Sequence, residues 1–284
     1  GNMRHPMISD VDQMSADDLA VMELSSFQLE VMTRSPQVAA VLNITPNHLD
    51  RHKTMEAYTA AKARILDFQR DRDIAVLGMD DAGAEGLAES VQGDLLTFGF
   101  SQPSESQAGC FLDGEQIAFW DGEAIHALFS REIIRLRGEH NLYNVLAACA
   151  LASAADLSVT AMANAVAGFM GVAHRLEFVR SWGGADWFND SIATAPERAI
   201  AAVRSFEEPL VLLLGGRDKD LPWNELATLV NQRVDHVILF GEAAGLIERA
   251  IGSQRAVRPY SVTRCENLEQ AVQSAAEVVE PGDV

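Results

Sequence analysis

Short apolar segments alternate along this chain with segments of helical character, and this alternation limits the folds open to it. VAAVLNI (38–44), DIAVLGM (73–79), LVLLLGG (210–216) and HVILFG (236–241) are typical of buried strands. LAVMELS (19–25) has the same character. Helices between buried strands are typical of parallel sheets, because a parallel crossover needs a long connection. The sequence therefore predicts an α/β fold with a mostly parallel sheet.

The pattern changes between residues 95 and 130. LLTFGF, GCFLDGEQIAFW and AIHALFS are short, punctuated by turns and lack helices between them, which predicts antiparallel hairpins beside the main sheet. Helices are expected next, over 141–156 and 160–170. A new alternation of strands and helices then begins, so we expect a first domain over residues 1–170 and a Rossmann-like second domain over 171–284.

The composition fits a globular protein, with 284 residues of which 48% are hydrophobic. No apolar run approaches the roughly 20 residues that cross a bilayer, and the start, GNMRHPMISD, has no secretory apolar region, so we expect a cytoplasmic protein without a membrane partner.

The net charge of −19 argues against a nucleic-acid partner, because its phosphates would be repelled. The cysteines are odd in number and far apart, which favours reduced thiols.

Lys62 lies on the apolar side of a predicted helix. Thr54 is the expected N-cap, and an apolar stripe follows it, formed by Tyr58, Ile65 and Leu66. Lys62 falls on that stripe. All but three of the 22 Lys and Arg residues are arginine, so lysine here suggests chemistry that a guanidinium lacks: a desolvated amine can lose its proton and act as a nucleophile. The alternative is a lysine that extends from the edge of the stripe into water.

Polar residues follow the first two predicted strands. Glu23 lies at the end of the first, and His48 follows the second. Sites in α/β sheets form at the carboxyl ends of strands, so this carboxylate and imidazole, near the Lys62 helix, are candidates to surround a metal ion. Each also has an ordinary explanation, since strand-end carboxylates are usually solvated and loop histidines often cap a neighbouring element.

Further candidates lie at helix starts and in a glycine-containing loop. Asn141 and Asn144 are one turn apart, so their amides should face the same side of a helix; Asn141 is also a possible N-cap. Thr194 is an expected N-cap that would direct backbone amides at an anion. In GGRDKDLPW (215–223), Arg217 and Lys219 supply positive charge for a carboxylate or phosphate, although a solvent-exposed turn is the alternative.

Seven motifs occur in an order that resembles the Mur ligase family. They are ELSSFQLE (23–30), LNITPNHLDRH (42–52), YTAAKARI (58–65), GEHNLYNVLAA (138–148), HRLEF (174–178), NDSIAT (189–194) and LLLGGRDKD (212–220). Their wording is most similar to members that add D-glutamate to UDP-N-acetylmuramoyl-L-alanine. The resemblance implies a partial central ATP-binding domain, a Rossmann-like C-terminal domain, and ATP-dependent amide ligation through an acyl phosphate in peptidoglycan synthesis.

The resemblance also implies two Mg²⁺ ions. Glu23 would bind the ion between the ATP phosphates, and His48 would bind the second. Lys62 would be carbamylated by carbon dioxide and help to hold that second ion. Magnesium prefers oxygen ligands, so a carbamate would replace a repelling ammonium by an attracting carboxylate.

The remaining implied contacts are to nucleotide and substrates. They are Asn141 and Asn144 near the nucleotide, Arg175 at its phosphates, Asp190 at its ribose, Thr194 and Lys219 at D-glutamate, and Asn2 at UDP-N-acetylmuramoyl-L-alanine. Closure of the second domain over the first would exclude water from the acyl phosphate. We expect a monomer with small-molecule partners.

The chain departs from the family pattern in three respects. No glycine precedes a lysine, so the family's phosphate-binding loop is absent from this sequence. The family's UDP-binding domain, last strand and serine-bearing loop are also expected to be missing, and a polypeptide of these residues alone is expected to be inactive. Ile192 stands where many relatives have a lysine, which removes one cation from the glutamate site.

Two alternatives stay open at this point. One is a non-catalytic module that retains the fold and binds nucleotide or a partner. The other is a different member of the superfamily, such as a folylpolyglutamate synthase, which the wording of ELSSFQLE and NDSIAT disfavours.

Overall fold

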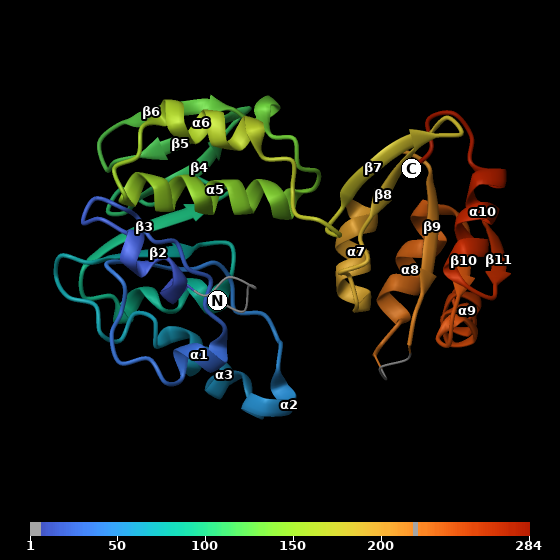
Figure 1. The fold of residues 1–284 in the computed structure, drawn as a ribbon, viewed down its shortest axis with the longest axis horizontal. Helices are drawn as coiled ribbons and strands as arrows, with labels where there is room; N and C mark the ends of the chain where they lie inside the picture. The colour runs from blue at the N-terminus through green and yellow to red at the C-terminus, as the bar shows by residue number, and fades with distance from the viewer. Residues whose placement is uncertain (1–6, 218–220) are drawn as a thin grey trace. The chain divides into compact units, whose positions relative to one another are not determined.

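The computed structural model describes residues 7–217 and 221–284. The chain divides into two compact units (Figure 1). Unit 1 runs to Ile133 and resumes over Tyr143–Ala167, and unit 2 consists of Ile134–Leu142 and Gly168–Val284. The division therefore falls inside one helix, α5 (Glu139–Ala154).

Unit 1 is built on one six-stranded sheet in the order β1-β2-β3-β4-β5-β6. Its strands are β1 (Val38–Val41), β2 (Ile74–Gly78), β3 (Asp94–Gly99), β4 (Ala108–Asp113), β5 (Gln116–Trp120) and β6 (Ile125–Ser130). β1 to β4 pair in parallel, and β4, β5 and β6 pair antiparallel. The predicted α/β class with a mostly parallel sheet is confirmed. LLTFGF was wrongly grouped with the hairpins, because β3 has a parallel neighbour on each side.

The strand predicted over residues 19–25 is absent. This segment forms no strand, and Leu19, Val21 and Met22 are exposed at 63%, 94% and 47%. A strand needs neighbours for its backbone hydrogen bonds and for its apolar side chains. The sheet order places no described strand beside β1 other than β2, so apolar character alone gave the wrong prediction here.

The helices of unit 1 are mostly short. They are α1 (Ser26–Leu29), α2 (Leu49–His52), α3 (Met55–Ala63), α4 (Ala82–Glu85), α5 and α6 (Val159–Gly168), with 3₁₀ turns at Met7–Ser9, Val11–Gln13, Ala88–Ser90 and Arg131–Ile133. Both α1 and α2 contact α3, and the three lie together in Figure 1. The predicted cap of α3 is confirmed, since Thr54 Oγ1 accepts a hydrogen bond from the Ala57 amide at 3.2 Å.

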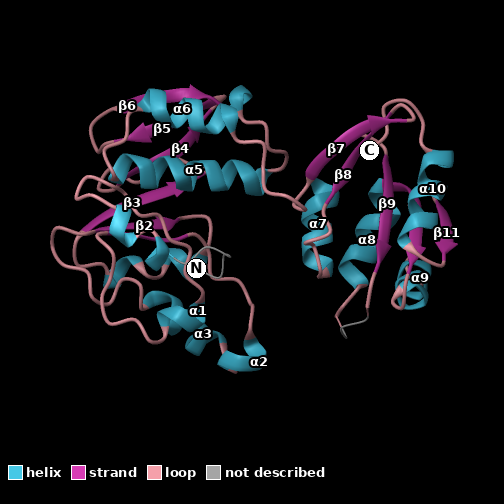
Figure 2. Ribbon diagram, viewed as in Figure 1, coloured by secondary structure: helices cyan, strands magenta, loops and turns pink. Residues whose placement is uncertain are grey.

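Unit 2 contains a hairpin and a parallel sheet, and Figure 2 shows helices around that sheet. The hairpin joins β7 (Glu177–Trp182) to β8 (Ala185–Asn189). The sheet has the order β11-β10-β9, with β9 (Leu210–Gly215), β10 (Val234–Phe240) and β11 (Ser261–Cys265). The helices are α7 (Pro196–Arg204), α8 (Asn224–Arg233), α9 (Ala244–Gly252) and α10 (Leu268–Val278).

Alternate residues of β10 supply two hydrophobic clusters in unit 2. Val237 and Leu239 belong to one cluster, and Ile238 belongs to the other, which includes Ala271 and Ala275 of α10. This alternation is that of a strand covered on both faces. The sequence does not predict β11, because SVTRC has polar and exposed positions and lies at a sheet edge.

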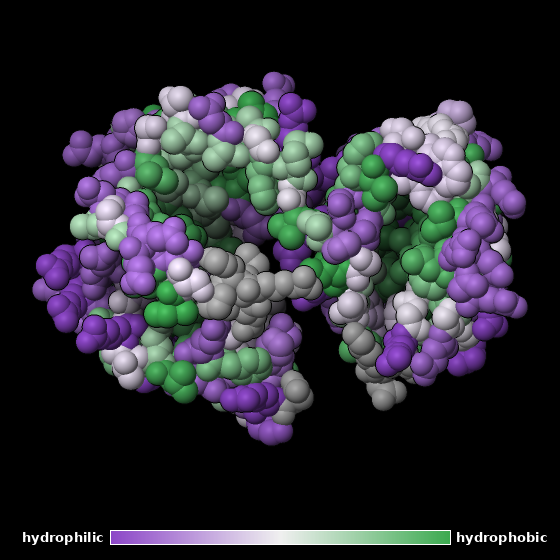
Figure 3. Space-filling model, in the orientation of Figure 1, coloured by the Kyte–Doolittle hydropathy of each residue, from purple (hydrophilic) through white to green (hydrophobic). Residues whose placement is uncertain are grey.

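The surface in Figure 3 carries many hydrophilic residues around the outer margin of each unit. Among the described residues, no helix is both long and apolar enough to cross a membrane. Cys110, Cys149 and Cys265 are not paired with one another in the structure.

Candidate functional site

Lys62 lies near the end of α3, half-buried, with its Nζ 5.4 Å from the centre of the Tyr58 ring. Burial lowers the pKa of Lys62 because it disfavours the charged ammonium, while the negative charges of Asp81 and Glu23 oppose that shift. The structure therefore brings together two of the residues selected from sequence, because Lys62 lies within electrostatic reach of the exposed Glu23. It adds Asp81, which sequence analysis missed.

Asp81 connects two loops of unit 1. Its Oδ1 accepts hydrogen bonds from the backbone amides of Ile44 at 2.9 Å and Ala84 at 2.8 Å. It thereby caps α4 and fixes the segment that follows β1. The signal that could have found it is the acidic pair directly after DIAVLGM, at the carboxyl end of β2.

His48 precedes α2 with a left-handed backbone (φ 53°) and an exposed side chain. Its ring packs edge-on against Phe27 at 5.1 Å. Within the described ranges, no three His, Cys, Asp or Glu side chains are grouped closely enough to hold a metal ion. Lysine is outside that set, so a ligand group that includes a modified Lys62 stays a prediction.

Asn141 and Asn144 differ in exposure. Asn141 is buried, and its Nδ2 donates to the carbonyl of Arg137 at 2.7 Å, whereas Asn144 is exposed. Asn141 is not the N-cap, because α5 already begins at Glu139.

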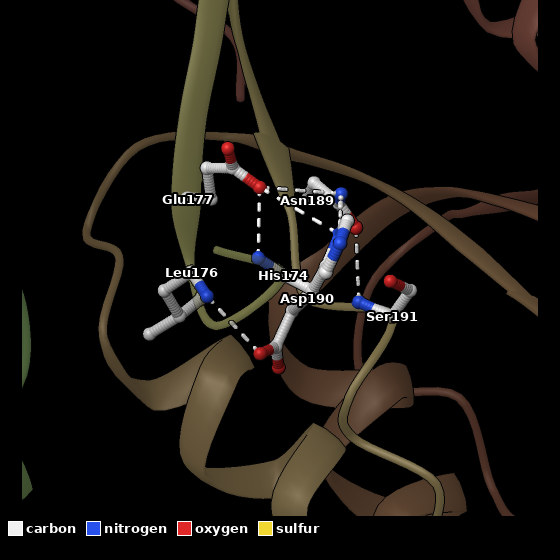
Figure 4. A network of polar contacts seen from close by, with 6 residues as sticks. All are labelled: His174, Leu176, Glu177, Asn189, Asp190 and Ser191. Atoms are coloured by element: carbon white, nitrogen blue, oxygen red, sulfur yellow. Dashed lines mark hydrogen bonds and ion pairs between the residues drawn. The ribbon is translucent and has the colours of Figure 1, made fainter. Parts of the chain in front are cut away.

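The HRLEF and NDSIAT motifs meet in unit 2, as Figure 4 shows. Asp190 Oδ1 accepts a hydrogen bond from the Leu176 amide at 3.1 Å. Glu177 Oε2 accepts one from the backbone amide of His174 at 2.8 Å, and the side-chain nitrogen Nδ2 of Asn189 lies 2.9 Å from Nδ1 of His174. The turn has left-handed backbone at two residues that are not glycine, His174 (φ 66°) and Leu176 (φ 42°). Such conformations persist where the surroundings hold them, as this network does.

Four titratable side chains gather around this turn, those of Arg175, Asp190, His140 and Arg198. Burial raises the pKa of Asp190, against the opposing effects of the Leu176 amide and the charges of Arg175, His140 and Arg198. Burial also lowers the pKa of His140, and the Arg175 charge adds to this effect, while Asp190 opposes it. The structure thus brings together the predicted pair, Arg175 and Asp190. It adds His140 and Arg198, which sequence analysis missed.

One further prediction is wrong, and two concern residues that the structure does not describe. Thr194 is exposed and is not the N-cap of α7; that position is Ala195, which makes no side-chain cap bond, and Pro196 begins the helix. Thr194 lies one residue before the N-cap position. Its backbone amide donates to the carbonyl of Ile192 at 2.9 Å, so Thr194 belongs to the preceding turn. Asn2 and Lys219 fall outside the described residues.

Two family models together match most of the chain. The Mur ligase middle domain matches residues 6–152, and the model described as Mur ligase, glutamate ligase domain, matches residues 174–284.

Curated relatives match over the whole chain. The UDP-N-acetylmuramoylalanine–D-glutamate ligases of Acetivibrio thermocellus and Koribacter versatilis are 36% and 39% identical to it, over 100% of this chain and 61% of each relative. The chain therefore spans about three fifths of the length of these relatives.

Solved structures share the fold. The UDP-N-acetylmuramate–alanine ligase MurC of Thermotoga maritima matches with a TM-score of 0.61 at 15% identity, over 91% of this chain and 56% of that one. The MurF ligase of the same organism, solved in complex with ADP, matches with a TM-score of 0.60 at 17% identity, over 88% and 57%.

Proposed function

Because this chain belongs to the Mur ligase family, we propose that it carries the ATP-binding and glutamate-binding domains of a ligase that joins D-glutamate to UDP-N-acetylmuramoyl-L-alanine. The specificity is supported by relatives named as D-glutamate ligases that match at 36–39% identity over the whole chain. We assign ATP binding to residues 1–170 and the Rossmann-like part to 171–284. The product would be a precursor of peptidoglycan, made in the cytoplasm by a monomer from water-soluble substrates.

The main structural support comes from Lys62. An amine reacts with carbon dioxide only in its neutral form, and burial lowers the pKa of Lys62 toward that form. The ammonium first loses one proton; the neutral amine then adds CO₂ at its nitrogen and releases a second proton, so that a carboxylate replaces an ammonium. That carboxylate would supply the oxygen donor that Mg²⁺ prefers at the second ion, beside the single nitrogen ligand His48, and Glu23 would supply an oxygen donor to the first ion.

The donor chemistry at Lys62 therefore fits a divalent cation. Bound Mg²⁺ would supply positive charge to the ATP phosphates and to the oxyanion that forms on the substrate. The chain's own residues would hold the reactants in place. The ions would be held by Glu23, His48 and carbamylated Lys62. The nucleotide would be contacted by Asn141, Asn144, Arg175 and Asp190.

The amide would form in two steps. The muramoyl-alanine carboxylate attacks the γ-phosphorus of ATP and ADP leaves, which gives an acyl phosphate. The D-glutamate amine then attacks the acyl carbon, loses a proton, and phosphate leaves. Thr194 and Lys219 would orient D-glutamate for this attack, and Asn2 would contact the muramoyl-alanine substrate. Arg175 would offset the negative charge of the phosphates.

A ligation assay tests this function. The full natural chain is incubated with UDP-N-acetylmuramoyl-L-alanine, D-glutamate, ATP and Mg²⁺, and the product is detected by mass spectrometry as substrate plus one glutamyl residue. Lys62→Arg should abolish the product, because arginine keeps the charge but cannot form the carbamate. Lys53→Arg is the matched control and should retain activity. Glutamylation of a folate substrate instead, or no product with either substrate, would refute the proposal.

A further inference from the structure

A series of ring contacts joins the two proposed cation ligands His48 and Lys62 within unit 1. The His48 ring lies 5.1 Å from Phe27, and Phe27 stacks on His52 at 5.5 Å with the ring planes 3° apart. His52 lies 5.2 Å from Tyr58, whose ring is 5.4 Å from Nζ of Lys62. His52 therefore occupies the middle of what we call the ring series.

Both ring nitrogens of His52 have partners. Ser26 Oγ lies 2.9 Å from Nε2, and Glu30 Oε1 lies 3.2 Å from Nδ1. An ionised carboxylate can only accept, so Glu30 favours a proton on Nδ1; a neutral imidazole with that proton accepts from the Ser26 hydroxyl at Nε2. Ser26 and His52 are each 7% exposed. A buried ring that is held at both nitrogens has one favoured orientation.

The backbone of α2 adds a second, independent observation. This four-residue helix is preceded by His48 (φ 53°) and followed by Lys53 (φ 69°), both in the left-handed region. Residues other than glycine rarely adopt such angles unless their surroundings hold them. His52 is the last residue of α2 and is buried, whereas His48 is exposed. Because His52 holds the buried end of this short helix, it can determine where His48 lies at the exposed end.

The order Ser26–His52–Glu30 is also that of a hydrolytic triad. Burial argues against this reading, because a nucleophilic hydroxyl must be reached by its substrate, and Ser26 and His52 are almost fully covered. Phe27 also stacks on the imidazole. The arrangement instead suits a structural anchor.

We propose that His52 is a positioning residue that holds His48 and Lys62 in a fixed relation for a divalent cation, acting through Phe27 and Tyr58. This inference rests on the proposed function, because it takes His48 and Lys62 as ligands of one ion. Residues behind metal ligands commonly change metal affinity by roughly 10–100-fold when they are replaced.

Binding of Mn²⁺ to the full natural chain tests this role. Free Mn²⁺ is titrated by electron paramagnetic resonance in bicarbonate buffer for the wild type, His52→Phe and Ser26→Ala. Phenylalanine keeps a ring for stacking but loses the contacts of both ring nitrogens of His52, with Ser26 and with Glu30. We expect Mn²⁺ affinity to fall at least about tenfold in His52→Phe and by a smaller factor in Ser26→Ala. The ring NMR signals of His48 should shift in both variants before any metal is added.

His236→Phe is the matched control. His236 also has partners at both nitrogens, Ser261 Oγ at 2.6 Å and Thr263 Oγ1 at 2.8 Å, but lies in the sheet of unit 2. Its replacement should leave Mn²⁺ affinity unchanged. Thermal unfolding checks that each variant is folded, and Ser26→Ala is the milder change if His52→Phe does not fold.

Two results would have different meanings. Wild-type Mn²⁺ affinity and unchanged His48 signals in His52→Phe and Ser26→Ala would overturn the positioning role. A wild type that binds no Mn²⁺ would count against the proposed function instead, and the His48 signals of the metal-free variants would still decide whether His52 positions His48.

Discussion

The carboxylate of Asp190 accepts a hydrogen bond from the backbone amide of Leu176 at 3.1 Å, and this bond joins the HRLEF and NDSIAT motifs across 14 positions of sequence. Leu176 directly follows Arg175, so the bond places the charge of Asp190 beside the turn that bears the arginine. The two residues proposed for the ribose and the phosphates of ATP thus belong to one network within unit 2.

Asp190→Asn should separate the stability of this turn from its binding role. Burial raises the pKa of Asp190, so between its ordinary and its folded pKa the folded protein binds more protons than the unfolded chain. The contribution of this group to stability therefore falls as the pH rises through the folded pKa. Asparagine keeps an acceptor for the Leu176 amide and has no charge to desolvate.

At pH 7 we expect Asp190→Asn to melt slightly above the wild type and to bind ADP about tenfold more weakly, since a charged hydrogen-bond partner is lost. Thermal unfolding and calorimetry measure the two effects. A less stable variant with unchanged ADP affinity would show that Asp190 acts only as a structural residue.

The sequence predicted best where a local pattern is sufficient. The cap at Thr54, the strands β2, β9 and β10, and Lys62 on its helix all followed from short-range spacing. The pairing partners of a strand do not follow from spacing. The strand prediction for LAVMELS is wrong for that reason, and the short polar β11 has no apolar pattern that would predict it.

The same limit applies to the site. Asp81 and His140 interact with residues that are distant in the sequence and near only in the folded protein. Asp81 lies 19 positions after Lys62, and His140 lies 50 positions before Asp190. The acidic pair in MDDAG marks a strand end, but neither it nor GEHN indicates which residues those side chains meet. The contact of His52 with Ser26 likewise joins two motifs that are separate in the sequence, ELSSFQLE and LNITPNHLDRH.

Carbamylation of Lys62 should be visible by NMR with ¹³C-labelled bicarbonate. Burial lowers the pKa of Lys62, so its neutral amine is populated at lower pH than that of an ordinary lysine. We expect a carbamate carbonyl signal that grows as the pH rises. The signal should vanish in Lys62→Arg and persist in Lys53→Arg. A signal that survives in Lys62→Arg would belong to a different amine and would remove this support for the function.

Arg137→Ala should destabilise unit 2 in a pH-dependent way. The Arg137 guanidinium lies 5.3 Å from the Phe188 ring, 5.1 Å from the Phe206 ring and 2.6 Å from Glu208 Oε1. Burial alone would raise the pKa of Glu208, but the hydrogen bond and charge of Arg137 and nearby backbone amides lower this pKa below its ordinary value. Stability from this carboxylate is therefore present above its unfolded pKa and is lost as the pH falls through its folded pKa.

We expect Arg137→Ala to lower the free energy of unfolding by about 2 kcal/mol at pH 7, from the lost ring and ion-pair contacts, and by less in acid. Urea unfolding followed by tryptophan fluorescence measures this difference. Arg135→Ala, at an exposed position two residues earlier, is the control and should have little effect. An equal loss at both pH values would exclude the role assigned to Glu208.

Gly78→Ala should destabilise unit 1, because the end of β2 has no room for a methyl group. A Cβ at this position would lie 2.3 Å from the carbonyl oxygen of Leu42 and 2.4 Å from the hydroxyl of Tyr143. We expect a loss of about 1–3 kcal/mol in the free energy of unfolding. Gly168→Ala is the control, since no atom lies within 4 Å of its added Cβ, and it should be neutral or slightly stabilising. Equal stabilities of the two variants would contradict the packing described around Tyr143.

Thiol labelling should distinguish Cys265 from the other two cysteines. Burial raises the pKa of Cys110, and it raises the pKa of Cys149 to about 12, so neither presents a thiolate near neutral pH. Both are buried, whereas Cys265 is half-exposed at the end of β11. A thiol reagent such as Ellman's reagent should therefore modify one cysteine quickly in the folded protein and all three in guanidinium. Cys265→Ser should abolish the fast phase. If a fast phase persisted in that variant, the core beside α5 would have to open much more readily than its burial indicates.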